Sequence, residues 1–333
     1  MTKDIENNNG LVEILLATYN GEKYITEQIN SIRAQSYKNW ILSINDDGST
    51  DTTMAIVKSA ANNEPRINLK SLSNNRYGAA GNFLALLADS SASYIMFCDQ
   101  DDIWYPNKIA LEMDAIRTAE ALYGTDVPLL VFTDSSIVDK ELKVINPSRS
   151  STVPFKPDNV SLAQLIISNV AQGCSILINR PLVKKMLLYP LPDVFVMHDY
   201  WAIVLAAIFG KVKYLPISTL SYRQHESNVW GASKNTLTAK DGLMHVLKEP
   251  AILRGWFSKL SHDEKDFIPR AQKVLEMFSD QLSDADCIML ERISRFEKAR
   301  RTEKYSTIRD YKLIKNNQRS TYSKLCQFLG MML

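Results

Sequence analysis

Cysteine is scarce in this chain of 333 residues, which contains four. They are Cys98, Cys174, Cys287 and Cys326. No two of them form a C-x-x-C pair or a metal-finger spacing, which excludes a disulfide framework and a zinc finger. We therefore expect buried free thiols and a cytoplasmic location, where thiols stay reduced.

Long hydrophobic runs are missing as well. Residues 1–10 are polar and lack the apolar stretch of a secretory signal. The best candidate for a membrane span, Trp201 to Phe209, has half the length of about 18 residues that a spanning helix needs. This run predicts a core helix, so we expect a protein that is soluble or attached only to a membrane surface.

An excess of one charge sign is absent from the whole chain but not from its C-terminal part. Lys and Arg number 39 against 37 Asp and Glu, and the net charge of +2 argues against a protein that coats nucleic acid. Residues 292–324, however, hold 11 basic and 3 acidic residues, so they carry +8 and the rest of the chain −6. Together with the apolar end Leu325 to Leu333, this stretch predicts either a surface that lies on an anionic membrane or a helical subdomain with solvated charges.

Several common enzyme motifs are also absent. The chain has no G-x-G-x-x-G after its first apolar run and no G-x-x-x-x-G-K-[ST], which excludes the usual dinucleotide and P-loop sites. It has no H-E-x-x-H and no G-x-S-x-G either. The composition, with 45% hydrophobic and 23% charged residues, is that of an ordinary globular protein.

What the sequence does contain is an alternation of predicted strands and helices. Apolar runs predict strands at residues 12–18, 40–45, 67–72 and 94–98. Helices are expected between them, near residues 25–32, 51–61, 79–88 and 107–123. The alternation predicts an α/β fold with a mostly parallel central sheet flanked by helices, in which ligands bind at the carboxyl ends of the strands.

The elements that follow are spaced less regularly. Strands are predicted at residues 129–133, 175–179, 213–215 and 219–223, and helices near 161–168, from 181 onward and at 201–209. From about residue 236 only helical periodicity remains. We therefore predict one α/β domain at residues 1–235 and a basic helical region at 236–333.

The strongest chemical signal is FCDQDDIW at residues 97–104, directly after the fourth predicted strand. Carboxylates in a D-x-D spacing can reach one hard divalent cation. Three aspartates in four residues would repel one another without a cation. An acidic loop that only caps the next helix is the alternative. We expect Asp99 and Asp101 to bind Mg²⁺ or Mn²⁺.

A second motif, DDGSTD at residues 46–51, follows the second predicted strand. A turn with a helix cap accounts for Gly48 and Ser49. It does not require both Asp46 and Asp47, whose carboxylates could accept hydrogen bonds from a base or a ribose.

Two shorter motifs lie further along the chain. MHDYW, residues 197–201, opens a helix, and Asp199 is either an ordinary cap or a general base in a cleft. In YRQH, residues 222–225, Arg223 could pair with a diphosphate and His225 could ligate a metal. Ordinary surface residues are the alternative for this pair.

Taken in order, these segments resemble the family 2 glycosyltransferases with the GT-A fold. The family resemblance lies in ATYNGEKYITEQINSIRAQSYKNW, INDDGSTD and FCDQDDIW. The later segments GCSILINR, HDYW and YRQHESNVWG are similar to bacterial rhamnosyltransferases that build surface polysaccharides. The resemblance spans about residues 11–232. It implies a Rossmann-like GT-A domain with a nucleotide-binding half at 11–110 and an acceptor half at 111–235.

The resemblance also implies roles for single residues. The nucleotide sugar would contact Thr18, Tyr19, Asn20, Asp46, Asp47, Arg76, Asp99, Gln100 and Arg223. The metal would be held by Asp99, Asp101 and His225, with Asp101 favoured as the direct ligand, and the acceptor would contact Gly173, Cys174, His198 and Trp201. Asp199 matches the catalytic base, although the family often has Glu-Asp where this chain has His198-Asp199.

The activity implied is an inverting, metal-dependent sugar transfer, with dTDP-β-L-rhamnose favoured as donor. The acceptor would be a glycan hydroxyl, on a lipid-linked or polyprenyl-diphosphate-linked oligosaccharide, in the synthesis of O-antigen, capsule or rhamnan. We expect the enzyme in the cytoplasm, at the inner face of the cytoplasmic membrane if residues 290–333 bind it. No nucleic-acid partner is expected, and a homodimer stays open.

Other functions stay open at this level. The same fold could use a UDP-hexose donor. A nucleotide-sugar-binding scaffold of a polysaccharide assembly complex would bind without transfer, but it would not need DQDD, HDYW and YRQH. A metal-dependent phosphoryl or nucleotidylyl transferase could also use a D-x-D motif, and the missing Gly- and Lys-rich phosphate loop argues against it.

Overall fold

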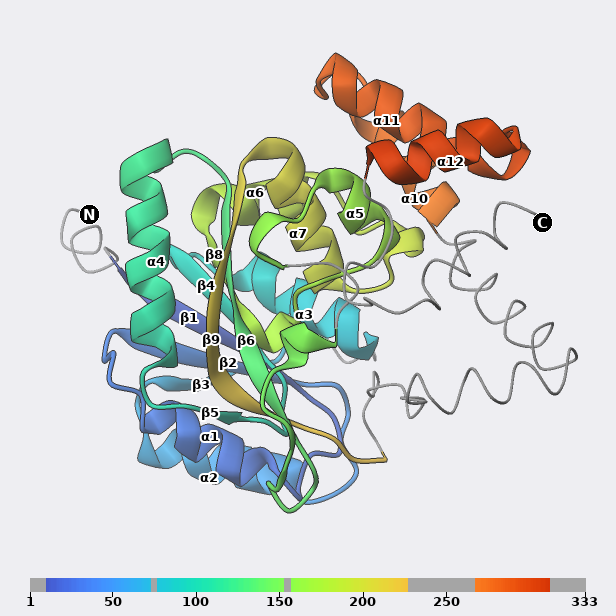
Figure 1. The fold of residues 1–333 in the computed structure, drawn as a ribbon. Coiled ribbons are helices and arrows are strands. Elements are labelled where there is room, and N and C mark those ends of the chain that lie inside the picture. The colour runs from blue at the N-terminus through green and yellow to red at the C-terminus, as the bar shows by residue number, and fades with distance from the viewer. Residues whose placement is uncertain (1–9, 73–76, 153–156, 227–266, 312–333) are drawn as a thin grey trace, which may run out of the picture. The chain divides into compact units, whose positions relative to one another are not determined.

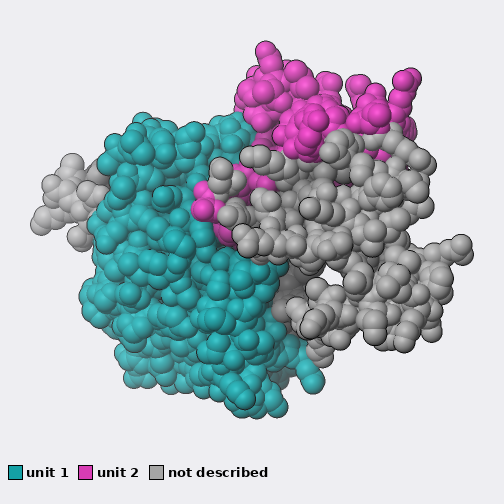
Figure 2. Space-filling view, viewed as in Figure 1, with its two compact units in different colours: residues 1–152, 171–228 teal, residues 153–170, 229–333 magenta. Residues whose placement is uncertain are grey.

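The structure is a computed structural model that describes residues 10–72, 77–152, 157–226 and 267–311. The chain divides into two compact units, which Figure 2 shows in different colours. Unit 1 comprises residues 1–152 and 171–228, and unit 2 comprises residues 153–170 and 229–333. The segment 153–170, which the sequence analysis assigns to the first domain, thus groups with the C-terminal residues.

Unit 1 contains one nine-stranded sheet in the order β3-β2-β1-β4-β8-β6-β9-β5, with β7 paired to β6 (Figure 1). The first four neighbours are parallel: β3 (Ile67–Leu69), β2 (Trp40–Asp46), β1 (Val12–Thr18) and β4 (Tyr94–Cys98). The others are β8 (Ile176–Asn179), β6 (Leu129–Val138), β9 (Lys211–Arg223), β5 (Ile103–Trp104) and β7 (Val144–Asn146). Because β8 runs antiparallel to both β4 and β6, it joins two parallel blocks into one mixed sheet.

Helices cover both faces of this sheet (Figure 1). Three pack on one face: α1 (Ile25–Arg33), α2 (Thr53–Asn63) and α4 (Lys108–Tyr123). Three pack on the other: α3 (Gly78–Asp89), α6 (Arg180–Leu188) and α7 (His198–Phe209). The isoleucines at 25, 29 and 32 form one buried stripe of α1, as their helical spacing predicts. Each isoleucine fully buried in this way contributes roughly 1.5–3 kcal/mol.

The predicted α/β sheet is confirmed, but two of its strands are longer than predicted. Residues 213–215 and 219–223 belong to a single strand, β9, which stays paired with β6 through register shifts near Thr133 and Asp134. Pro216 lies at that irregularity, where a residue without an N–H is tolerated. β6 continues past Thr133 through the buried polar residues Asp134, Ser135 and Ser136. The short strand β5 has no clear signal in the sequence, whereas β7 forms with β6 the hairpin that the turn residues Asp139, Asn146 and Pro147 predict.

Unit 2, within its described residues, contains helices and no strand. They are α5 (Leu162–Ile167), α10 (Phe267–Phe278), α11 (Asp284–Ser294) and α12 (Arg301–Asp310). Phe267, Val274 and Phe278 of α10 are buried, as are Leu290 and Ile293 of α11. The Arg270 guanidinium donates to the carbonyl oxygen of Ile167 at 3.3 Å and so satisfies the end of α5.

None of the helices in the described parts of the chain is long and apolar enough to cross a membrane. The apolar run from Trp201 to Phe209 lies in α7, and its first six residues are buried in unit 1.

Candidate active site

The polar residues that follow β1 and β4 lie side by side at the carboxyl edge of the sheet. Gln100 joins the two loops, because its Oε1 accepts from the Thr18 hydroxyl at 2.6 Å and from the Tyr19 N–H at 3.0 Å. Its Nε2 donates to the Tyr19 carbonyl at 3.1 Å. A Cβ at Gly21 would lie 2.3 Å from Gln100 Oε1, so a larger residue there would displace the Gln100 side chain from this crossing.

The loops after β1 and β2 are joined by Asn20. This residue has a φ of 46°, in the left-handed region that asparagine tolerates better than most residues. Its N–H donates to the Ser49 hydroxyl at 2.8 Å, and its side-chain oxygen accepts from the Thr50 N–H at 2.8 Å. The predicted nucleotide-binding residues therefore also hold the strand-end loops together.

The two aspartates of DDGSTD serve the local backbone. Asp46 accepts from the Ser49 hydroxyl at 2.5 Å and from the Ser49 N–H at 2.8 Å. Asp47 accepts from the N–H groups of Tyr77 and Gly78, at 2.7 and 2.9 Å, where α3 begins. Both carboxylates thus organise the loops at the rim of the site, which leaves only their remaining lone pairs for a ligand. Arg76, the other predicted contact in this region, lies outside the described residues.

The acidic turn after β4 is largely buried. Asp101 is 9% exposed and Asp102 is fully buried. Burial, with the charges of Asp101 and Asp199, raises the pKa of Asp99 to about 7. Burial, with the charges of Asp101 and Asp99, also raises the pKa of Asp102 well above its usual range. Without a cation, the ionised forms of these groups are therefore disfavoured.

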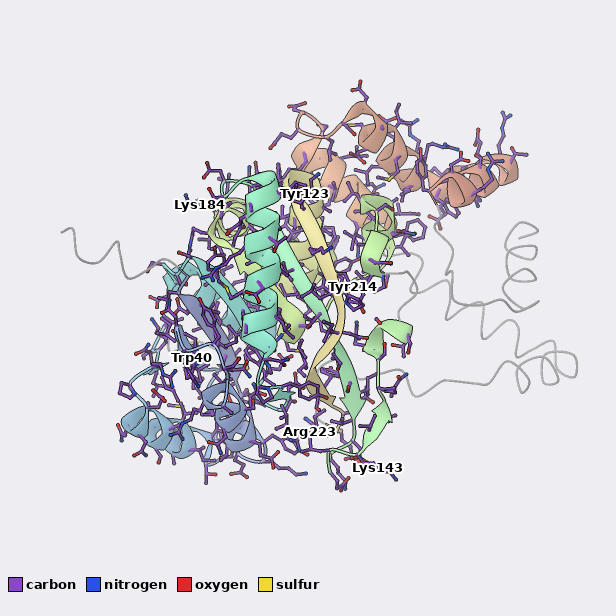
Figure 3. The ribbon with its side chains drawn as sticks, turned by 60° about the vertical axis from the view of Figure 1, so that its left-hand side comes forward. Trp40, Tyr123, Lys143, Lys184, Tyr214 and Arg223 are labelled. Carbon is purple, nitrogen blue, oxygen red and sulfur yellow. The ribbon has the colours of Figure 1, made fainter. Side chains whose placement is uncertain are left out.

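Arg223 lies behind this turn rather than on its open side. It is 2% exposed, and its Nε donates to the Asp101 carbonyl at 2.9 Å. Its backbone N–H donates to Asp102 Oδ1 at 3.1 Å, and its Nη1 donates to the carbonyl of Lys140 in the β6–β7 hairpin at 3.0 Å. Figure 3 labels Arg223 at the end of β9, near Lys143 of the same hairpin. Arg223, which was predicted to bind diphosphate, thus holds the acidic turn in place through hydrogen bonds.

Two residues that the sequence analysis missed contact the Arg223 guanidinium. The Arg223 Nη2 pairs with the Glu27 carboxylate, and its guanidinium lies 4.4 Å from the centre of the Tyr24 ring. The Tyr24 ring also stacks on the ring of His225, with the two centroids 4.9 Å apart. Glu27 and Tyr24 look like ordinary residues of an amphipathic helix, so no local signal marks them.

The donor set of the acidic turn fits a divalent cation. His225 Nε2 lies 2.8 Å from Asp101 Oδ2, which supports the pairing of these two predicted ligands. Oδ2 of the buried Asp102 has no hydrogen-bond partner among the described residues. Ligand atoms of Asp99, Asp102 and Cys174 lie within 4.8 Å of one another. Carboxylates and an imidazole are ligands that Mg²⁺ and Mn²⁺ accept, and a cation would compensate the buried charge.

Asp199 lies in the first turn of α7 and is half-buried. Its Oδ1 accepts from the Tyr200 N–H at 2.7 Å, and the Gly173 N–H bonds to the same carboxylate. Burial raises the pKa of Asp199, while these N–H groups and the charge of Arg149 act in the opposite direction. Asp199 lies against Gly173, and the next residue, Cys174, lies beside the acidic turn, so Asp199 and the acidic turn are neighbours. A half-buried carboxylate with a raised pKa is suited to general-base catalysis.

The predicted acceptor contacts divide into two groups. His198 is 2% exposed and lies between the rings of Phe83 and Phe97, at centroid distances of 4.2 and 4.5 Å. Trp201 is fully buried, and its indole N–H donates to the Tyr189 carbonyl at 2.8 Å. Both therefore support α7 from within the core and present no surface to an acceptor. Gly173 does border the site, since a Cβ on it would lie 3.6 Å from the Cβ of Asp199, whereas Cys174 is 1% exposed and presents no surface to an acceptor.

Arg149 is a site residue that the sequence analysis did not identify. Its charge attracts Asp199, and burial lowers the pKa of its guanidinium. The two neighbouring serines are both fixed by Asp134, which accepts from the Ser148 hydroxyl at 2.6 Å and from the Ser150 N–H at 2.9 Å. In the sequence, this region is marked only by the polar stretch TDSS at residues 133–136, which follows the apolar half of β6 and contains Asp134.

Comparison with solved structures shows the fold class of this protein. The crystal structure of S. aureus TarS 1-349 in complex with UDP-GlcNAc aligns with a TM-score of 0.55, covering 90% of this chain and 80% of that chain at 16% identity. The mixed sheet with acidic residues at the ends of parallel strands is accordingly the GT-A fold, as predicted.

Sequence comparison gives the family. The model of glycosyl transferase family 2 matches residues 13–160, which include β1 to β7 and the acidic turn. The dTDP-rhamnosyl transferase RfbG of Shigella flexneri is 30% identical over 229 residues, which cover 66% of this chain and 74% of the relative. The UDP-Glc:alpha-D-GlcNAc-diphosphoundecaprenol beta-1,3-glucosyltransferase WfgD of Escherichia coli is 34% identical over 134 residues, 39% of this chain and 50% of the relative. The chain belongs to glycosyl transferase family 2 and is a glycosyltransferase.

Proposed function

We propose that this protein is an inverting, metal-dependent glycosyltransferase that moves a sugar from a nucleoside diphosphate to an acceptor hydroxyl. The observation that supports the proposal is the proximity of Asp199 to the acidic turn. Asp199 lies against Gly173, and the ligand atom of the next residue, Cys174, lies within 4.8 Å of those of Asp99 and Asp102. Bound to Asp99, Asp101 and His225, Mg²⁺ or Mn²⁺ would neutralise the charge that grows on the departing diphosphate.

Asp199 takes the proton of the acceptor hydroxyl as its oxygen attacks the anomeric carbon. The N–H groups of Gly173 and Tyr200 orient this carboxylate, and the charge of Arg149 favours its ionised form. With one base and no enzyme nucleophile, the reaction is a single displacement. A β-linked donor would then give an α-linked product.

The favoured donor is dTDP-β-L-rhamnose. Support comes from the RfbG relative, whose name specifies dTDP-rhamnosyl transfer, and from the segments GCSILINR, HDYW and YRQH. A UDP-hexose is the second candidate, because the WfgD relative is named for transfer from UDP-Glc. The diphosphoundecaprenol in that name supports a polyprenyl-linked glycan as acceptor, in the synthesis of a cell-surface polysaccharide.

Membrane attachment through residues 290–333, at the cytoplasmic face, is a separate part of the proposal. Part of the basic charge is used within unit 2, where Arg292 donates to the Ser306 hydroxyl at 2.7 Å and pairs with Asp310 at 3.3 Å. The remaining lysines and arginines could face anionic lipids. Co-sedimentation with anionic liposomes should be strong for the full chain and weak for a chain ending at residue 289. Equal binding of both forms would remove this part of the proposal.

The catalytic part is tested by Asp199→Asn. A panel of dTDP-, UDP- and GDP-sugars with Mg²⁺ or Mn²⁺, read by thermal shift, first identifies the donor. Release of nucleoside diphosphate with donor and acceptor should then fall by at least about a thousandfold in Asp199→Asn, with donor binding unchanged. Asp193→Asn, an exposed carboxylate shortly before α7, is the matched control and should keep full activity. Near-normal turnover of Asp199→Asn would refute the base assignment, and donor binding without any release in the wild type would favour a scaffold.

A further inference from the structure

Cys174 is placed at the acidic turn by the antiparallel pairing of β4 with β8. In this pairing Met96 lies opposite Leu177 and Tyr94 opposite Asn179. Cys174 lies in the short 3-10 helix Gly173–Ser175, which directly precedes β8 and packs against β4. The thiol therefore reaches the aspartates although it comes from the acceptor half of the chain.

The three side chains form a compact set of potential ligands. One ligand atom each of Asp99, Asp102 and Cys174 lies within 4.8 Å of the other two. Asp102 is fully buried, and its Oδ2 has no hydrogen-bond partner among the described residues. Cys174 is 1% exposed, whereas Asp99 is half-buried and connects the set to the open side of the turn.

The chemical type of the three ligand atoms determines which cation would fit between them. Two carboxylate oxygens alone would suit a hard cation, and the sulfur adds a preference for softer ones.

The distances are compatible with zinc. With Zn–S near 2.3 Å and Zn–O near 2.1 Å in tetrahedral geometry, a sulfur and an oxygen on one ion lie about 3.6 Å apart. Ligand atoms that now lie within 4.8 Å of one another would need to approach by at most about 1.2 Å. A water or a donor oxygen would fill the fourth position.

We propose that Asp99, Asp102 and Cys174 form a binding site for thiophilic divalent cations such as Zn²⁺, with Cys174 as the residue that sets this selectivity. Binding forms an S–metal bond, and the thiol proton leaves to solvent. A thiophilic ion at Asp99 competes with Mg²⁺ at the adjoining pair Asp101 and His225, so it inhibits transfer. Only this last consequence rests on the proposed function.

The test uses Co²⁺ as a spectroscopic probe on the full-length, reduced, metal-free protein. Thiolate coordination to Co²⁺ produces a sulfur-to-metal charge-transfer band in the near ultraviolet. The wild type should show this band, and Zn²⁺ should abolish it at near-stoichiometric concentration. Mg²⁺ should need at least about a hundredfold excess over Zn²⁺, since it avoids sulfur ligands.

Three variants decide the assignment. Cys174→Ser should lose the band and bind Zn²⁺ about a hundredfold more weakly, and Asp102→Asn, which keeps the thiol, should also weaken Zn²⁺ binding at least tenfold. Cys287→Ser, in α11 of unit 2, is the matched control and should behave as the wild type. A band that persists in Cys174→Ser, or unchanged Zn²⁺ affinity in both site variants, overturns the proposal. Should Cys174→Ser fail to fold, Asp102→Asn still decides.

The two proposals fail separately. The Co²⁺ titration needs no sugar, so absence of the band leaves Mg²⁺-supported transfer untouched. A normal band in a protein that transfers no sugar would refute the proposed function and retain the thiophilic site.

Discussion

Replacing His198 by leucine should make the folding stability of this protein less sensitive to acid. His198 is buried between Phe83 and Phe97, and neither ring nitrogen has a hydrogen-bond partner among the described residues. Burial lowers the pKa of His198 to about 3 in the folded state. In the unfolded chain the pKa of a histidine is about 6.5.

The sign follows from this difference. Between these two pKa values the unfolded state binds a proton that the folded state does not, so stability falls as the pH falls below about 6.5. Lowering the pH from about 7.5 to 5 protonates most unfolded His198 and none of the folded, which costs about 2 kcal/mol. Asp99, Asp102 and Asp199, with raised pKa values, act in the opposite direction. The difference between variant and wild type cancels their contribution.

The assay is urea unfolding of the wild type and His198→Leu at both pH values. Between about pH 7.5 and pH 5, the free energy of unfolding of the wild type should decrease by about 2 kcal/mol more than that of His198→Leu. Phe83→Leu, which alters the same aromatic contact without removing a titrating group, is the control. It should lose similar stability at both pH values. Equal pH dependence of His198→Leu and the wild type would show that His198 is not buried and neutral.

Further predictions concern the residues around Asp199 and the acidic turn. Gly173→Ala would bring a Cβ to 3.3 Å from His198 Nε2, so we expect a kcat about tenfold lower, measured by nucleoside diphosphate release, with an unchanged melting temperature. Arg149→Gln should lower kcat at least about tenfold, and Arg149→Lys should restore much of it, because the charge is what favours ionised Asp199. Because burial raises the pKa of Asp199, kcat should fall on the acid side at a pH above the usual aspartate range. Arg223→Gln should lower both the free energy of unfolding, measured in urea, and the affinity for Mn²⁺, measured by titration, because Arg223 bonds to Asp101 and Asp102. A loss of donor affinity alone would contradict this structural role.

The parts of the fold that the sequence predicted are those with a local cause. The apolar run at residues 12–18 and the isoleucines of α1 bury as their periodicity requires, because backbone geometry alone sets which side chains share a face. The prediction of two separate strands at residues 213–215 and 219–223 was wrong, because Pro216 is typical of a strand end in the sequence. In the sheet, pairing with β6 on either side of the irregularity keeps the strand continuous.

The site shows the same division. The sequence showed that polar and acidic residues follow β1, β2 and β4. Their position at one edge of the sheet could be predicted, because parallel strands bring their carboxyl ends together. The roles of Arg223 and His198 were not, because each depends on burial by residues far away in the chain. Arg223 contacts Asp102 across a separation of 121 residues, and Phe83 and Phe97 enclose His198 from other elements.

By itself, the sequence determined the α/β alternation, the acidic turn and the presence of a carboxylate at the start of α7, because strand, turn and helix preferences act over a few residues. Only the tertiary structure decided that Cys174 lies beside Asp99 and Asp102, that the charge of Arg149 acts on Asp199, and that Arg223 is buried. These relations depend on strand register and on which face of each element is covered. Register and packing are properties of the assembled sheet, and no single segment carries them.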